Sequence, residues 1–314
     1  MKNTILAFCC ILLQQPLFAE NKDWLIDGSP YKTEVNLSSD KKQIELTNGL
    51  LRRSFSLTPN GATIALDNLM TGQNELRAVR PEAVLVINGK EYPVGGLEGQ
   101  PVHNFLTKDF LSGMQLCDSA FVLAGYTVSE TKERFPWKPN EAWISNRYPW
   151  PVPGKRITFT YRAPRKIVDE CKGLTIRIVY ELYDGAPILS KWIEIENNGQ
   201  KAVTLDSFKS EVLALVETAP KVHYGEPHEV RMMAQKTGYY TEDYRKRPVQ
   251  TDAPRDYIDR FTQLFVVTDY AMGGDMEAMK DNPAVRWVFD HPEYEFTGIR
   301  YYGQYKPARL EVTP

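Results

Sequence analysis

The sequence predicts a mainly β protein, an antiparallel β-sandwich that forms one large domain. Three observations support this prediction. Alternating apolar and polar residues recur along the chain, Asn-Gly and Asp-Gly pairs separate several of the alternating runs, and few stretches have the 3.6-residue period of a helix. The content of 17 tyrosines, 6 tryptophans and 21 prolines also suits strands joined by turns.

The clearest single element is a hairpin over residues 174–199. Two alternating runs flank an Asp-Gly-Ala-Pro turn that begins at Asp184. In the first run five apolar residues share one side: Leu174, Ile176, Ile178, Tyr180 and Leu182. A period of two is that of a strand with one buried face. We therefore expect a long antiparallel hairpin here.

Two Asn-Gly pairs predict two further hairpins, because this dipeptide readily adopts the positive φ angles of tight hairpin turns. The first pair separates strands expected at 42–46 and 50–57, and the second separates strands expected at 83–87 and 91–94. The remaining alternating runs predict strands at 63–66, 120–128, 157–162, 202–216 and 263–268. One short helix is expected near residues 274–280.

The first residues have the pattern of a secretory signal peptide. Lys2 supplies a positively charged n-region, residues 5–13 form the apolar core, and Ala19 is a small residue at the expected cleavage site. This core is too short for a transmembrane helix, which needs about 20 apolar residues. We expect a signal peptide over residues 1–19, a single mature domain over 20–314, and a periplasmic or secreted protein with no membrane span.

The cysteines leave two questions open. Cys9 and Cys10 raise lipidation as the alternative to secretion, although both lie within the apolar run and a lipidated cysteine should stand at its end. Cys117 and Cys171 remain in the mature chain. In an oxidising compartment, a disulfide between them would stabilise the fold by about 4 kcal/mol. Two buried thiols are the alternative, because the sequence does not fix the distance between the two side chains.

The charge balance excludes two classes of partner. The chain has 38 basic and 40 acidic residues, a net charge of −2. Such a balance produces no electrostatic field that would attract nucleic acid or an anionic membrane surface.

An aromatic, proline-rich segment over residues 134–154 is the candidate binding site. Its five prolines exclude an interior strand, so its aromatic rings are expected on a loop. Flat rings beside amide and charged groups are suited to the C–H face and the hydroxyl groups of a sugar. The candidate carbohydrate-binding residues are Trp137, Trp143, Tyr148, Trp150, Asn146 and Arg147. The alternative is that the tryptophans anchor a long loop to the sandwich.

The histidines do not form a metal-binding pattern. His223 and His228 are five residues apart with Pro227 between them, whereas a helix places two zinc ligands four residues apart and a strand places them two apart. We expect no metal and no cofactor.

Two stretches of the sequence resemble a known family. The hairpin segment YELYDGAPILSKWIEIENNG and the segment YPWPVPGKRITFTYRAP are similar to the N-terminal domain of alpha-galactosidase-type glycoside hydrolases, that is, glycoside hydrolase family 36 and its relatives. The similarity extends over about residues 40–312. It implies a two-layer antiparallel β-supersandwich of the galactose mutarotase-like kind and an association with carbohydrate.

The same resemblance implies that the chain lacks the family's catalytic residues. In these relatives the two catalytic carboxylates lie in a (β/α)₈ barrel that follows the N-terminal domain, and this chain has no βαβ pattern. No catalytic residue can be assigned by resemblance. We expect an N-terminal domain that stands alone, either as a truncated reading frame or as a short secreted protein.

The hairpin carries four carboxylates that are candidates for acid/base chemistry: Glu181, Glu194, Glu196 and Asp184. Asp184 is better explained as the first turn residue before Gly185.

The sequence therefore favours a secreted carbohydrate-associated domain that binds a glycan or oligosaccharide and has no hydrolytic activity of its own. One alternative is an enzyme of mutarotase or epimerase type that uses His223, His228 or His291 with a nearby carboxylate. Another is a structural module that docks a separate catalytic barrel through exposed apolar surface.

Overall fold

A computed structural model describes residues 23–101, 106–138, 149–164, 171–215, 236–237, 265–266, 285–289 and 308–312. These residues form a mainly β structure of several antiparallel sheets, which confirms the predicted fold class. The galactose mutarotase-like form of the sandwich stays a prediction. The expected signal peptide and the expected helix near residues 274–280 lie outside the described residues.

The first sheet is a five-stranded meander in the order β1-β2-β3-β4-β5. Its strands are β1 (Glu34–Leu37), β2 (Gln43–Thr47), β3 (Leu51–Ser56), β4 (Ala62–Asn68) and β5 (Gln73–Asn74). The predicted hairpin around the first Asn-Gly pair is confirmed by β2 and β3. Asn48 also donates hydrogen bonds from Nδ2 to the carbonyl oxygens of Tyr183 and Ala186, at 2.8 and 2.7 Å. This turn is thereby attached to the turn of a second hairpin.

The second sheet has the order β12-β11-β10-β9. Its strands are β9 (Val122–Glu130), β10 (Gly154–Arg162), β11 (Leu174–Tyr183) and β12 (Leu189–Asn197). The predicted hairpin over residues 174–199 is confirmed by the register of β11 and β12, in which Leu174 faces Asn197 and Leu182 faces Leu189. Gly185 in its turn has a φ of 78°. The five apolar residues predicted to share one side of β11 are all buried.

Two further sheets complete the sandwich. The third has the order β13-β7-β8, with β7 (Ala83–Ile87), β8 (Lys90–Val94) and β13 (Leu205–Lys209). The fourth has the order β17-β18-β14-β6, with β6 (Leu76–Ala78), β14 (Glu211–Leu215), β17 (Val285–Phe289) and β18 (Ala308–Val312). A separate parallel pair joins β15 (Lys236–Thr237) to β16 (Phe265–Val266). The second Asn-Gly hairpin is confirmed by β7 and β8, with positive φ angles at Asn88 and Gly89.

The expectation of one continuous strand over residues 202–216 is wrong. The chain forms β13 and β14, which pair with different partners: β13 with β7, and β14 with β6 and β18. Between them the backbone N–H of Ser210 donates to the carbonyl oxygen of Val312, at 2.8 Å. The change of partner depends on strands that are distant in sequence, so the local pattern does not identify which sheet each part joins.

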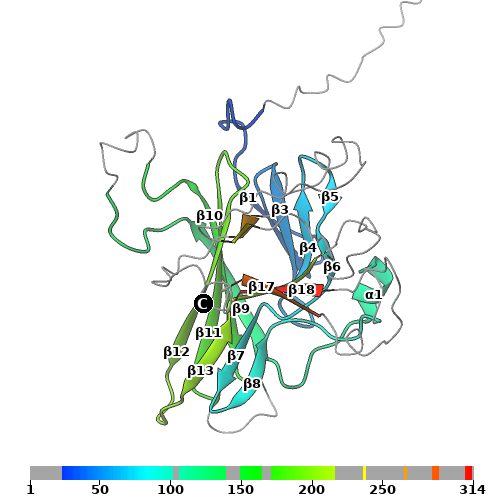
Figure 1. Cartoon of the computed structure of the whole chain (residues 1–314), viewed down its shortest axis with the longest axis vertical. Helices are drawn as coiled ribbons and strands as arrows, with labels where there is room; N and C mark the ends of the chain where they lie inside the picture. Colours follow the sequence, from blue (N-terminus) through cyan, green and yellow to red (C-terminus); the bar gives the residue numbers. More distant parts are fainter. Residues whose placement is uncertain are drawn as a thin grey trace, which may run out of the picture.

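The sheets pack on a shared apolar core. Its buried residues come from β2, β3, β7, β8, β10 and β11, so three of the sheets contribute to one cluster. In Figure 1 the strands β9 to β12 occupy one side of the molecule and β3 to β5 the other, with β17 and β18 between them. The only α-helix of the described residues, α1 (Lys108–Gly113), lies at the periphery. Thr107 caps it by accepting a hydrogen bond from the backbone N–H of Phe110.

Four charged side chains meet inside this core, and we call them the buried ion cluster: Arg53, Glu82, Lys191 and Glu211. Arg53 is on β3, Glu82 directly precedes β7, Lys191 is on β12 and Glu211 begins β14. Three of the four larger sheets therefore contribute one member each, and Glu82 adjoins the remaining sheet. The side chains of Arg53 and Glu82 are 3% and 1% exposed.

Glu211 is the centre of the buried ion cluster. Its carboxylate lies 2.7 Å from Nη1 of Arg53 and 2.6 Å from Nζ of Lys191. Nζ of Lys191 also donates to the carbonyl oxygen of Glu82, at 2.5 Å. The hydroxyl of Tyr180 donates to the Glu82 carboxylate, and the Arg53 guanidinium lies over the Tyr180 ring, 4.6 Å from its centroid. Every charge of the cluster has an opposite charge or a hydrogen-bond partner.

Burial and the neighbouring opposite charges shift the pKa values of the charged side chains in this cluster in opposite directions. Burial alone would raise the pKa of Glu211, but the charges of Arg53 and Lys191 and their hydrogen bonds lower it from 4.5 to about 2. Burial lowers the pKa of Lys191 in spite of its two acidic neighbours. Burial also raises the pKa of Tyr180 well above its ordinary value, so this hydroxyl stays a donor.

Candidate functional site

The structure brings together the two described tryptophans of the predicted carbohydrate site. The ring centroids of Trp137 and Trp150 are 5.0 Å apart, and the ring planes form an angle of 51°. The other four predicted binding residues lie outside the described residues: Trp143, Asn146, Arg147 and Tyr148.

The base of the connection between β9 and β10 is held by backbone contacts. Thr131 donates from its N–H to the carbonyl oxygen of Gly154 at 3.3 Å, and from Oγ1 to that of Val152 at 2.6 Å. Gly154 is required where β10 begins, because a Cβ there would lie 2.1 Å from the carbonyl oxygen of Leu182 on β11. The segments that carry Trp137 and Trp150 thus leave the sheet from a fixed point.

Three rings form the feature that we call the aromatic platform: Phe135, Trp137 and Trp150. Phe135 contacts Trp150 with a centroid distance of 5.6 Å and is 48% exposed. Nε1 of Trp150 donates to the carboxylate of Glu133, at 3.1 Å. The platform therefore combines partly exposed ring surface with a carboxylate at its edge, which are the two components of sugar recognition.

Sequence reasoning missed a second set of aromatic contacts, on the sheet beside the platform and distinct from it. The guanidinium of Arg134 lies over the rings of Phe135 and Trp192, at 5.9 and 4.7 Å from their centroids. Arg156 also lies over the Trp192 ring, at 5.1 Å. The one signal in the sequence was the position of Trp192 on the outward-facing side of β12, with Glu194. A cation–π contact between separate strands leaves no pattern along the chain.

The carboxylates of the hairpin are engaged in ion pairs with arginines on the same sheet. Glu181 is buried and lies 2.6 Å from Nη2 of Arg156. Arg177 contacts two glutamates of β12, at 2.5 Å for Glu196 and 4.0 Å for Glu194. The hydrogen bond from Arg177 lowers the pKa of Glu196. Glu196 is therefore ionised at neutral pH, whereas a general acid in glycoside hydrolysis needs a raised pKa.

Asp184 has the turn role that the sequence assigned to it. It precedes Gly185 in the β11–β12 turn and accepts a hydrogen bond from the backbone N–H of Thr33, at 2.8 Å. Lys32 lies 3.1 Å from the same carboxylate. Partial burial would raise the pKa of Asp184, but the hydrogen bonds from Thr33 and Lys32 lower it.

Of the two alternatives for Cys117 and Cys171, the disulfide is not formed, and both are thiols. Cys171 is buried in the main core beside the start of β11. Cys117 lies in the segment that follows α1, where its Sγ is 3.1 Å from Oγ of Ser119. The alternative of two buried thiols holds for Cys171, whereas Cys117 is partly exposed.

The histidines weighed for mutarotase chemistry, His223, His228 and His291, lie outside the described residues. In the part of the chain that the structure describes, no three His, Cys, Asp or Glu residues are placed to hold a metal ion. No helix of the described residues has the length and apolar character to cross a membrane.

Comparison with known proteins returned no match among family models, curated proteins or solved structures.

Proposed function

We propose that this protein is a secreted carbohydrate-associated β-sandwich domain that binds glycan on its aromatic platform and has no hydrolytic activity of its own. The observation that carries the proposal is the contact between Phe135, Trp137 and Trp150 at the end of the β9–β10 hairpin, with ring surface left exposed. The choice of carbohydrate as ligand also follows the expectation, drawn from the sequence alone, that the hairpin segment resembles alpha-galactosidase-type enzymes.

The packing of the rings favours recognition over the anchoring of a loop. An anchor would place its rings in the apolar core of the sandwich. Trp137 and Trp150 instead contact each other and Phe135, and neither is among the residues that form or border the main core. The charged groups beside them, Glu133 and Arg134, are exposed and can reach sugar hydroxyl groups.

The platform is suited to weak binding. Offset or tilted ring contacts contribute about 0.5–1.5 kcal/mol beyond area burial, and a platform open to solvent desolvates only one face of a sugar. We therefore expect dissociation constants of about 0.1–1 mM for a short oligosaccharide.

Trp137→Ala is expected to weaken oligosaccharide binding by about 1–3 kcal/mol, because it removes one ring of the platform. The expected change in melting temperature is small, since Trp137 does not border the main core. Titration calorimetry of the mature protein against a glycan panel that includes α-linked galactosides measures the affinity, and a thermal scan measures the stability.

Trp192→Ala is the matched control, because Trp192 has the same ring but two guanidinium groups lie over it. We expect this variant to lose stability and to keep its glycan affinity. A Trp137→Ala protein that binds every glycan normally but melts much earlier would show that the ring is an anchor. A wild-type protein that binds no member of the panel would also contradict the proposal.

Purified protein is expected to release no nitrophenol from aryl-galactosides. Retaining hydrolysis needs a nucleophilic carboxylate and, about 5–5.5 Å away, an acid with a raised pKa. On the hairpin, the pKa values of Asp184 and Glu196 are lowered, whereas a general acid needs a raised pKa. Turnover that persists after removal of contaminating enzymes, and that Glu181→Gln abolishes without unfolding the protein, would contradict the expectation.

A further inference from the structure

The three rings of the aromatic platform do not lie in one plane. The ring planes of Trp137 and Trp150 form an angle of 51°, and those of Phe135 and Trp150 an angle of 45°. Trp150 contacts both of the other rings, with centroid distances of 5.0 Å to Trp137 and 5.6 Å to Phe135. All three side chains are exposed or partly exposed. The ring faces that the platform offers to a ligand therefore point in different directions.

Hydrogen bonds hold Trp150 in its inclined position. Its Nε1 donates to the carboxylate of Glu133 at 3.1 Å, and this bond joins the two arms of the β9–β10 connection. The arm that carries Trp150 is also attached to the sheet, because the N–H of Asp184 in the β11–β12 turn donates to the carbonyl oxygen of Pro153, at 2.9 Å. We therefore expect the angle between the rings to be present before a ligand binds.

Inclined rings distinguish between sugar chains of different shape. A sugar binds an aromatic ring by laying its C–H face against the π surface. Consecutive sugars of a flat ribbon, such as a β-1,4-linked glucan, present faces that are nearly parallel, so a ribbon or a crystal of ribbons can lie flat on only one of the inclined rings. Consecutive sugars of a coiled chain, such as an α-1,4-linked glucan, turn relative to one another. Two of them can then each contact a different ring.

We propose that the aromatic platform selects soluble, coiled oligosaccharide chains over flat ribbons and crystalline polysaccharide. This inference rests on the proposed function, because it specifies the shape of the glycan that the platform binds. Glu133 is a positioning residue in this account: it accepts the hydrogen bond from the indole N–H of Trp150 and so maintains the angle between the rings.

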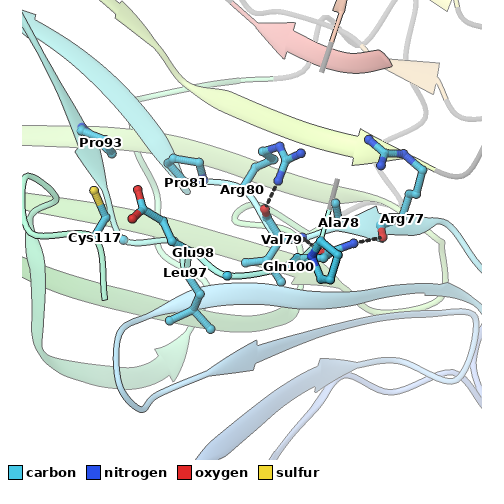
Figure 2. A pocket seen from close by; sticks show the side chains of 14 residues that line it. Arg77, Ala78, Val79, Arg80, Pro81, Pro93, Leu97, Glu98, Gln100 and Cys117 are labelled. Carbon is cyan, nitrogen blue, oxygen red and sulfur yellow. Dashed lines mark hydrogen bonds between the residues drawn. The ribbon is translucent and has the colours of Figure 1, made fainter. Parts of the chain in front are cut away.

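A pocket elsewhere on the molecule provides a control for the place of binding. It has a volume of about 400 Å³ and lies beside the β6–β7 connection and the segment that follows β8 (Figure 2). Gly95 and Gly96 line it. The pocket adjoins Pro93, whose carbonyl oxygen accepts from the N–H of Phe121 just before β9, whereas the platform follows the far end of β9. A chain bound on the platform should leave the amide resonances of the two glycines in place.

The test compares two coiled chains, maltohexaose and an α-1,4-linked galactohexaose, with two flat ones, cellohexaose and chitohexaose. Maltohexaose and cellohexaose are a matched pair, since they differ only in linkage. Calorimetry of the mature protein is expected to give a dissociation constant about tenfold lower for the better coiled chain than for either flat one. Microcrystalline cellulose and chitin are expected to retain no protein.

Flat chains that bind as tightly as the coiled ones, or retention on the crystalline polymers, would overturn the proposed selectivity and leave the proposed function in place. Absence of binding to all four chains would also overturn it, and the wider glycan panel then decides whether the proposed function stands. Binding that shifts the amide resonances of Gly95 and Gly96 and leaves the indole resonance of Trp150 unmoved would place the ligand in the pocket and contradict both.

Variants of Glu133 test its positioning role through the ratio of the maltohexaose and cellohexaose affinities. Glu133→Ala is expected to lose most of the preference for the coiled chain, because Trp150 loses its acceptor, whereas Glu133→Gln is expected to keep it, because the amide oxygen still accepts. Glu130→Gln is the control for loss of a nearby charge: its carboxylate pairs with Lys155, and its side chain is 73% exposed. A folded Glu133→Ala protein with an unchanged ratio would overturn the positioning role.

Discussion

Arg53→Met is expected to lower the free energy of unfolding by about 3–5 kcal/mol. The change removes the main cation that faces Glu211 and leaves that carboxylate buried with Lys191 as its one remaining charged partner. It also removes the guanidinium that lies over the Tyr180 ring. Because the members of the buried ion cluster lie on or next to each of the four larger sheets, loss of Arg53 weakens the place where these sheets meet. Urea denaturation followed by circular dichroism measures the change.

Arg52→Met is the matched control. Arg52 is the neighbouring residue on β3, and its guanidinium lies 2.8 Å from Asp67, but its side chain is 39% exposed. Exposed ion pairs contribute about 0–1 kcal/mol, so this variant should lose at most about 1 kcal/mol. Equal losses for the two arginines would contradict the importance assigned to the buried ion cluster.

A double variant tests whether the loss comes from uncompensated charge. Arg53→Met with Glu211→Leu removes one cation and one anion, and it leaves Lys191 near Glu82 at 3.9 Å. We expect the double variant to be more stable than the sum of the two single losses predicts, with a coupling of about 1–3 kcal/mol. Strict additivity would show that the two side chains contribute independently.

Acid is expected to destabilise the protein by about 3 kcal/mol through Glu211 alone. The pKa of Glu211 is about 2 in the folded protein, below its ordinary value of 4.5. Because the folded-state pKa is the lower one, the stabilisation is fully present above about pH 4.5 and is lost as the pH falls from there to about 2. Unfolding free energies measured between pH 6 and pH 2 should show this slope.

Two variants assign the acid transition to its residue. Glu211→Gln should be less stable at neutral pH and should depend less on pH below about 4.5, since it no longer binds a proton on unfolding. Glu196→Gln should leave the transition nearly unchanged, because solvent screens the pair of Glu196 with Arg177. An acid slope that persists in Glu211→Gln would contradict the lowered pKa.

The sequence predicts the hairpins of this fold well because their signals are local. Asn48-Gly49, Asn88-Gly89 and Asp184-Gly185 each mark a turn that the structure contains, with a positive φ at the glycine. The alternation on β11 identifies its buried side for the same reason. The alternating runs at 63–66, 120–128 and 157–162 also correspond to strands, namely β4, β9 and β10. Other strands were not expected, among them β1, β6, β17 and β18, and the break at Ser210 depends on a partner strand about 100 residues away.

The buried ion cluster could not be predicted, because its members are brought together only by tertiary packing. One partial signal was present. Lys191 stands on the same side of β12 as Leu189 and Ile193, and a lysine on an apolar side indicates a buried partner. Nothing in the sequence identifies that partner as Glu211.

At the candidate site, too, some residues have a local signal in the sequence, whereas others are brought together only by the fold. The density of tryptophan and proline in the sequence indicated Trp137 and Trp150, whereas the contact of Arg134 with Trp192 joins the β9–β10 connection to β12. The pair Gly95-Gly96 is a local signal of close backbone packing, and the reason for it becomes visible only when Gly61 and Pro81 are placed against it. Residues far apart in sequence determine most of this geometry.

Binding of glycan to the aromatic platform is the central claim, and the indole N–H resonances of the tryptophans test it most directly. The chain has 6 tryptophans, and single Trp→Phe variants assign their signals in a proton–nitrogen correlation spectrum. On titration with a glycan that the protein binds, the resonances of Trp137 and Trp150 should move and saturate together, while that of Trp192 stays in place. Saturation by the glycan with both platform resonances unmoved would contradict the claim.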